Sequence, residues 1–178
     1  MGTVTTSLDA PKTPRRGIGW SIAGAVVLLA WDVILTGSFE LSILVCPIWF
    51  VVSIVKNVIQ RPGRRIALMR IAIPVVILAL VLLNDTIQRG IAEGNAEKII
   101  AACEKFHAEN SRYPKTLDEL VPQYLSSVPR AKYCMDPFGQ FMYWNFEEDN
   151  DAALVWYVVP PFGRSVYNFK EQRWGYVD

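Results

Sequence analysis

Three apolar runs fill the first half of the chain and constrain its fold more than any other feature. They cover residues 18–35, 41–59 and 66–83. Each has roughly the 18–20 residues that an α-helix needs to cross about 30 Å of hydrocarbon. Lipid offers no hydrogen-bond partners to the backbone, so segments that span a bilayer must be helical. The runs predict a membrane protein with three transmembrane helices in residues 18–84.

Basic residues beside these runs predict the orientation of the helices, because cytoplasmic loops are enriched in lysine and arginine. They precede the first run and separate the second from the third: Lys12, Arg15, Arg16, Lys56, Arg61, Arg64 and Arg65. The link at residues 36–40 has none. We therefore expect a cytoplasmic tail at residues 1–17 and an exported domain at residues 85–178. In a bacterium this corresponds to an inner-membrane protein with a periplasmic domain.

Asp32 is an acidic residue within the first apolar run. An intramembrane carboxylate is by default a candidate for a functional role. Asp32 lies near the outer end of its run, where a carboxylate can reach the lipid headgroups. The sequence therefore favours an interfacial aspartate and leaves its role open.

The exported part combines a helical pattern with several strand patterns. Apolar residues recur every three or four positions from residue 87 to residue 109, and no proline separates this segment from the third run. One long helix can therefore connect the two. Aromatic and β-branched residues then predict strands at 141–146, 153–159 and 165–169, with a short fourth segment at 174–177. We expect an α+β fold in which a long helix packs on a small antiparallel sheet.

The order of short motifs after this helix resembles a known family. The motifs are Asn110-Ser111-Arg112-Tyr113-Pro114, Thr116-Leu117-Asp118-Glu119-Leu120, Val128-Pro129, Asp136-Pro137-Phe138-Gly139 and an aromatic strand containing Tyr143. The order resembles bacterial type IV pilins and is most similar to the major pseudopilins of type II secretion. The resemblance covers about residues 92–144, and the later strands are compatible with it. It implies a pilin-like domain with pilin-like protein partners.

The membrane half differs from that family. Pilins and pseudopilins begin with a short basic leader, a cleavage site and one apolar helix, whereas three apolar runs precede the domain here. The segment Arg64-Arg65-Ile66-Ala67-Leu68 does not match the family's cleavage junction. We therefore expect a pilin-like head on a fixed membrane anchor rather than a filament subunit.

Two cysteines of the exported part, Cys103 and Cys134, are candidates for a disulfide. An oxidising compartment would favour the bond, and the loop of about 30 residues would contribute about 3–4 kcal/mol by chain-entropy reasoning. The sequence does not show whether the two Cα atoms approach closely enough, so the pairing stays open. Cys46 lies in the second apolar run, where it is expected to act as a small apolar residue.

One acidic loop is a candidate calcium site. It contains Glu147, Glu148, Asp149 and Asp151. The heads of major pseudopilins bind calcium in a loop of their C-terminal sheet, so the resemblance implies such a site here, and carboxylates suit that ion. A solvated hairpin turn explains the same residues, because Asp and Asn favour turns. Apart from calcium, no cofactor is expected.

The remaining patterns favour a binding protein over an enzyme. His107 is the single histidine and lies four residues after Cys103, but Cys103 shares the apolar face of the predicted helix, which favours burial over catalysis. No basic stripe suggests nucleic-acid binding. We expect an accessory protein of a type IV pilus or type II secretion system that binds pilin-like subunits. The alternative is a membrane-anchored immunity protein that binds a toxin or enzyme in the periplasm.

Overall fold

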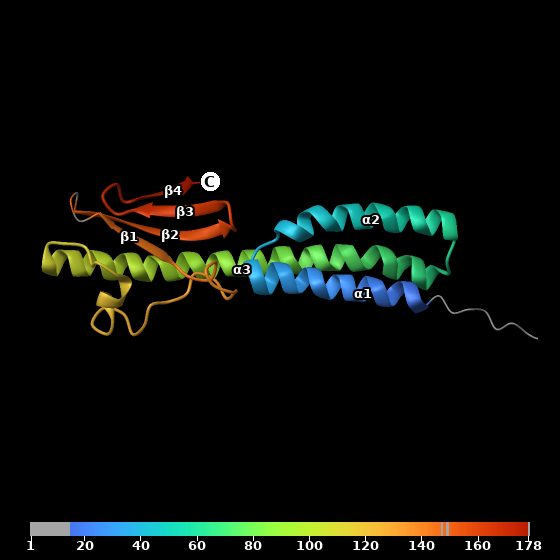
Figure 1. The fold of residues 1–178 in the computed structure, drawn as a ribbon, viewed down its shortest axis with the longest axis horizontal. Helices are drawn as coiled ribbons and strands as arrows, with labels where there is room; N and C mark the ends of the chain where they lie inside the picture. The colour runs from blue at the N-terminus through green and yellow to red at the C-terminus, as the bar shows by residue number, and fades with distance from the viewer. Residues whose placement is uncertain (1–14, 147, 149, 178) are drawn as a thin grey trace, which may run out of the picture.

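The computed structural model describes residues 15–146, 148 and 150–177. Four helices and then four strands follow one another along the chain, with one short helix between the two groups. The elements are α1 (Arg15–Leu29), the π-helix η1 (Ala30–Thr36), α2 (Glu40–Gln60), α3 (Arg64–Asn110), the 3-10 helix η2 (Leu117–Leu120), β1 (Met142–Phe146), β2 (Asp151–Val159), β3 (Gly163–Asn168) and β4 (Arg173–Val177). The molecule is elongated, with the sheet at one end and the pair α1 and α2 at the other (Figure 1).

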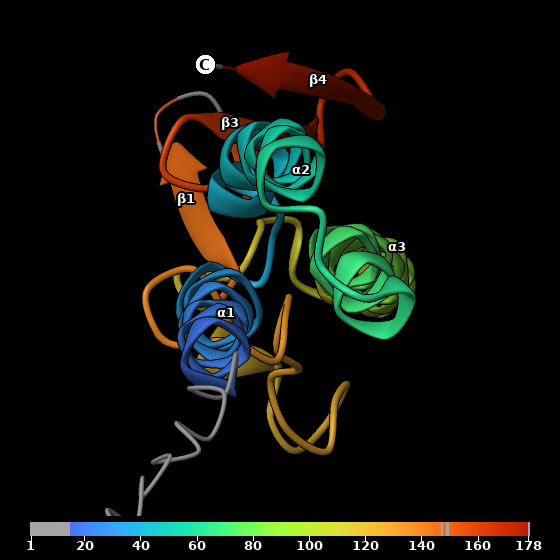
Figure 2. The ribbon, with the colours of Figure 1, turned by 90° about the vertical axis from the view of Figure 1, so that its right-hand side faces the viewer.

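Three helical segments are long and apolar enough to cross a membrane. Each contains an 18-residue stretch of high mean hydropathy: 1.7 in Gly19–Thr36, 2.0 within Glu40–Gln60 and 2.8 within Arg64–Asn110. Most of their large apolar side chains point away from the bundle and are exposed. The three helices contact one another through a small cluster centred on Leu28, Cys46, Ile77 and Val81. Figure 2 shows the three helices nearly end-on as separate rods around this contact.

Helix α3 belongs to both halves of the molecule. Its 47 residues run without a break through Pro74, which gives a length of about 70 Å. The first half packs against α1 and α2, and the second half packs against the sheet (Figure 1). The prediction that one helix connects the third apolar run to the following domain is therefore confirmed.

The sheet is an antiparallel meander in the order β1-β2-β3-β4. Its strands lie within two residues of the segments predicted from the sequence. Strand β2 is the most buried, and its register pairs Leu154 with Tyr143 of β1 and with Tyr167 of β3. The α+β fold class, a long helix on a small antiparallel sheet, is confirmed.

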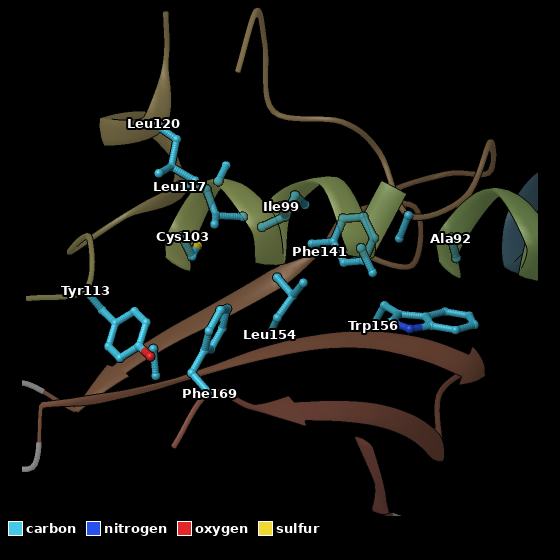
Figure 3. Packing of buried hydrophobic residues seen from close by; sticks show 14 of the residues in the cluster. Ala92, Ile99, Cys103, Tyr113, Leu117, Leu120, Phe141, Leu154, Trp156 and Phe169 are labelled. Atoms are coloured by element: carbon cyan, nitrogen blue, oxygen red, sulfur yellow. The ribbon is translucent and has the colours of Figure 1, made fainter. Parts of the chain in front are cut away.

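The core of the head lies between the sheet and α3 and continues to the far side of the helix. Ala92, Ile99 and Cys103 of α3 face Leu154 and Trp156 of β2 (Figure 3). On the far side of the helix, Leu117 and Leu120 of η2 pack against it (Figure 3). Helix α3 is thus the middle layer of the head, between the sheet and the segment that contains η2.

Candidate functional site

A buried lysine marks the place where the head meets the helical half. Lys132 has no exposed surface. Its Nζ donates hydrogen bonds to the carbonyl oxygens of Gly37 (3.2 Å) and Val158 (2.9 Å), and it lies 5.7 Å from the centre of the Trp156 ring. Burial lowers the pKa of Lys132, and the nearby Asp85 carboxylate opposes this shift. The ammonium group therefore connects the link after η1 to strand β2.

Neighbouring contacts extend this junction. The amide of Met135 donates to the carbonyl of Ile34 (2.8 Å). The side chain of Gln88 accepts from the amide of Tyr133 (2.9 Å) and donates to its carbonyl (3.4 Å). Gly37 has a φ of +61° and lies so close to Cys134 that a Cβ there would be 3.0 Å from its sulfur. Together these contacts hold the loop at residues 132–135 against the end of the helical half.

Asp32 lies in this region but does not reach the surface. It is fully buried in the π-helix η1, and its carboxylate accepts hydrogen bonds from the amides of Leu41 (3.2 Å) and Ser42 (2.7 Å). These are among the first amides of α2, which have no partner within their own helix. The Asp32 carboxylate is turned into the protein, where it satisfies the N-terminus of α2. Its position at the membrane interface stays a prediction.

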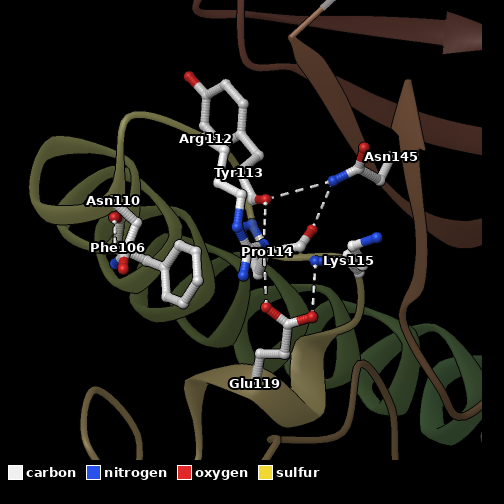
Figure 4. Close-up of polar contacts among 8 residues, drawn as sticks. All are labelled: Phe106, Asn110, Arg112, Tyr113, Pro114, Lys115, Glu119 and Asn145. Atoms are coloured by element: carbon white, nitrogen blue, oxygen red, sulfur yellow. Dashed lines mark hydrogen bonds and ion pairs between the residues drawn. The ribbon is translucent and has the colours of Figure 1, made fainter. Parts of the chain in front are cut away.

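The Arg-Tyr-Pro turn after α3 is held by side chains from two other segments (Figure 4). Glu119 accepts from the amide of Lys115 (3.2 Å) and from Arg112 Nη1 (3.1 Å). Asn145 of β1 donates to the carbonyls of Tyr113 (3.4 Å) and Pro114 (2.6 Å). The motifs at residues 110–114 and 116–120 therefore have a structural role, because their contacts connect α3 to η2 and to the sheet.

The two cysteines considered for a disulfide are free thiols that lie in different parts of the head. Cys103 is buried between α3 and the sheet. Cys134 follows Tyr133, which contacts Gln88, and Cys103 lies 15 residues beyond Gln88 on α3. This separation is about 22 Å along the helix, whereas disulfides need Cα atoms about 4.4–6.8 Å apart. The bond between Cys103 and Cys134 is therefore not formed in this structure.

Two residues of the acidic loop, Glu148 and Asp151, lie within the described part of the chain. Asp151 uses its carboxylate within the sheet, where it accepts from the amides of Ala152 (2.7 Å) and Lys170 (3.1 Å) and from Asn168 Nδ2 (3.2 Å). Glu147 and Asp149 lie outside the described residues. Among those described, no group of three or more His, Cys, Asp or Glu side chains is placed to hold a metal ion. The calcium hypothesis stays a prediction.

The ring of the single histidine contacts Tyr113 and Asn150. The His107 ring stacks on Tyr113 with centroids 4.3 Å apart, and its Nε2 is 3.3 Å from Asn150 Nδ2. Cys103 points into the core, where burial raises the pKa of its thiol to about 12. The arrangement gives His107 a packing role at the distal end of the head.

Strand β4 is one of the two edge strands of the sheet, and its outer edge is open. All five of its residues are exposed, and its partner is β3 on one side alone. In the end-on view, β4 lies at the periphery of the molecule with no other element beyond it (Figure 2). Trp174 and Tyr176 are large side chains with 42% and 58% of their surface exposed. Backbone groups on such an edge can pair with a strand of another chain.

Comparison of the chain with protein-family models, with curated proteins and with solved structures finds no match. The site is therefore described by its geometry alone. That geometry contains a buried junction between the two halves and an exposed sheet edge with aromatic side chains. Sequence reasoning did not identify Lys132, because a lysine in a loop carries no local signal of burial.

Proposed function

We propose that the chain is a membrane-anchored protein-binding module whose head binds a partner protein through strand β4. The open edge of β4 and its exposed aromatic side chains carry this proposal. An edge strand offers main-chain hydrogen bonds to an added strand, and aromatic side chains give such contacts area and specificity. An exposed edge of this kind in a free protein would otherwise favour aggregation, so a cognate partner is its natural use.

The anchor is proposed to be the three-helix half. Its outward-facing apolar side chains would be costly in water, and a bilayer removes that cost. The positions of the lysines and arginines support a cytoplasmic N-terminus and a head on the opposite side. In a bacterium the head would be periplasmic and the anchor would lie in the inner membrane.

The proposed setting is a type IV pilus or type II secretion system, in which the protein would be an accessory component. The order of motifs at residues 110–143 resembles that of pseudopilins, and the packing of a long helix on a small antiparallel sheet is compatible with a pilin-like head. The expected partners are pilin-like subunits. We propose no enzymatic activity.

A second setting is favoured by the anchor. Three membrane-spanning helices would hold the head permanently at the membrane, and the contacts of Lys132 connect the head to them. A permanently held binding head also suits a membrane-anchored immunity protein that intercepts a toxin or enzyme in the periplasm. The two settings share the binding surface and differ in the identity of the partner.

The test is site-specific photo-crosslinking of the full chain in its native membrane. A benzoylphenylalanine in place of Tyr176 probes β4, and the same residue in place of the exposed Gln123 probes the opposite side of the head. We expect a discrete crosslinked partner from position 176 and none from position 123. Pilin-like subunits would identify the accessory protein, and a secreted toxin would identify the immunity protein. Absence of a crosslinked protein at position 176 would refute binding through β4.

A further inference from the structure

A groove lies beside β4, between the sheet and the flank of α3. It has a volume of about 330 Å³ and is lined by Glu93, Glu97, Trp156, Ser165 and Trp174. The register places Trp156 opposite Ser165, and Leu154 and Trp174 both opposite Tyr167. Directly paired residues share one face of a sheet, so these side chains lie on the face that α3 covers in part. The groove is the part of that face that α3 leaves uncovered.

The two glutamates give this groove a negative charge that the head does not neutralise. Glu93 and Glu97 are exposed and lie four residues apart on α3. Like charges at this spacing repel each other and destabilise a helix slightly. Neither carboxylate forms an ion pair with any residue that the structure describes. Lys132, 5.7 Å from the ring of Trp156, is buried and bonded to two carbonyl oxygens, and Arg89, four residues before Glu93, pairs with Asp85.

Aromatic rings form the opposite wall. Trp174 packs against Tyr167 with ring centroids 5.2 Å apart and keeps 42% of its surface exposed. The buried Trp156 contributes to the lining, and its indole N–H has no acceptor among the described residues. A cation that enters between carboxylates and an indole ring gains both ion-pair and cation–π energy. Of the common side chains, arginine also stacks flat on such a ring.

The position of the groove favours a protein over a lipid as the source of this cation. Glu93 and Glu97 lie 10 and 14 residues beyond the last residue of the third apolar run, Leu83. On a continuous helix these separations are about 15 and 21 Å. The headgroup layer adds about 5–8 Å to each side of the hydrocarbon. The groove is therefore beyond the reach of lipid amines in the proposed membrane setting.

We infer that this groove receives an arginine or lysine side chain from the partner protein. The inference rests on the proposed function, because it names the chemistry that the partner presents next to β4. A groove of this volume is at the lower end for a ligand site, which suits one or two side chains rather than a whole cofactor. The partner segment would add to the edge of β4 while its basic side chain enters between Trp174 and the two glutamates.

The experiment measures the crosslink from position 176 in two pairs of variants. In the first pair, the double variant Glu93→Gln/Glu97→Gln removes both carboxylates of the groove. Its control is the double variant Glu109→Gln/Asp118→Asn, which removes two exposed carboxylates from the η2 side of the head. The second pair compares Trp174→Ala with Trp144→Ala, whose side chains are 42% and 43% exposed. Trp144 is paired with Ala153, so it lies on the opposite face of the sheet from Leu154.

We expect the replacement of Glu93 and Glu97 by glutamine to reduce the crosslink yield by about fivefold or more at moderate salt. Trp174→Ala should reduce the yield by about two- to fivefold. The two matched controls should leave it unchanged. The crosslinked peptide of the partner should carry an arginine or lysine close to the attachment point. A crosslink that survives both groove variants, or that attaches to a segment without basic residues, would overturn this inference while leaving binding through β4 intact. If the protein with its native groove residues gives no crosslink from position 176, the proposed function itself is refuted.

Discussion

Lys132 shows how one side chain can hold together two halves that are far apart in sequence. Its ammonium group bonds to Gly37, which is 95 positions earlier, and to Val158, which is 26 positions later. A buried charge is costly unless hydrogen bonds replace its lost hydration. Two carbonyl oxygens and the ring of Trp156 provide that replacement. The residue is therefore a buried polar contact between the head and the link that follows η1.

Replacing this lysine should loosen the junction. In Lys132→Ala the carbonyls of Gly37 and Val158 lose their donor, at a cost of about 1–3 kcal/mol in the free energy of unfolding. Cys134 packs against Gly37, so its alkylation by a thiol reagent should become faster. Mass spectrometry of the labelled peptide measures the rate. Lys98→Ala is the control, because Lys98 bonds to Asn95 at an exposed position. Equal rates in all three proteins would show that Lys132 does not hold the junction.

Tyr113 should make the head sensitive to alkaline pH. Burial, assisted by the Glu104 carboxylate, raises the pKa of Tyr113 from 10.0 to about 12. Between these values the folded head keeps a proton that the unfolded chain releases, so stability falls as pH rises. Tyr113→Phe should remove this loss, which amounts to at most about 1.4 kcal/mol per pH unit. Denaturation midpoints at about pH 9 and about pH 11 measure it. The same pH dependence in the variant would contradict the assignment.

At the scale of elements, the turn between η1 and α2 depends on a side chain that belongs to the preceding helix. Asp32 accepts from two amides at the start of α2, and Gly37 turns the chain with a positive φ. The residue at the N-cap position, Phe39, makes no side-chain bond to the helix. Asp32 therefore replaces the missing cap, although it precedes the two amides by 9 and 10 positions.

Removing this distant cap should destabilise the helical half. Asp32→Ala leaves the amides of Leu41 and Ser42 without an acceptor, and we expect a loss of about 1–2 kcal/mol. Thermal unfolding followed by circular dichroism in detergent measures the change. Asp32→Asn retains one side-chain oxygen and should lose less. A variant Asp32→Ala as stable as the parent would show that the amides find other partners.

Helix α3 contains two glycines that can be replaced without a clash. A Cβ at Gly90 or at Gly94 would meet no atom within 4 Å outside its own helix. Alanine is favoured over glycine inside a helix by about 0.5–1 kcal/mol. Gly90→Ala and Gly94→Ala should each stabilise the head by about this amount in denaturant titrations. Gly139→Ala is the contrasting variant, because its Cβ would lie 2.7 Å from the carbonyl oxygen of Cys134, and it should destabilise the head.

Local patterns were sufficient to predict most of these elements. The three apolar runs match the helical segments, and all four strands lie within two residues of their predicted positions, because both periodicities are expressed over neighbouring residues. The continuity of α3 from the third apolar run into the head followed from the absence of a proline between Leu83 and Asn110. The π-helical form of η1 was not predicted, since it depends on how Asp32 and Gly37 fit the start of α2.

The candidate sites were harder to predict because they depend on long-range contacts. Lys132 lies in a loop with no apolar periodicity, and its burial comes from Gly37 and Val158. The groove combines Glu93 and Glu97 of α3 with Trp174 of β4, which lies 81 and 77 positions later. The separation of Cys103 from Cys134 likewise required the path of α3. Residue type identified the candidates, and the tertiary structure decided which of them meet.

For the whole molecule, the proposed orientation places the head and the loop between α2 and α3 on opposite sides of a membrane. A cysteine introduced at the exposed Ser126 of the head should react with a membrane-impermeant thiol reagent in cells whose outer membrane has been opened. One introduced at Gly63, between α2 and α3, should react only after the inner membrane is broken. The reverse pattern would invert the orientation, and equal labelling of both positions would exclude membrane crossing.

Because α3 is one unbroken helix, a change in its tilt in the membrane moves the whole head. From Leu83 to Asn110 the helix extends about 40 Å beyond the hydrocarbon in the proposed setting. Transmembrane helices tilt by about 20° on average, and the tilt responds to bilayer thickness. A rigid rod tilted by this angle displaces its far end sideways by about 14 Å. The sideways position of β4 would then depend on the thickness of the membrane. A change in lipid thickness could alter the binding of a partner to β4 without any change in the structure of the head.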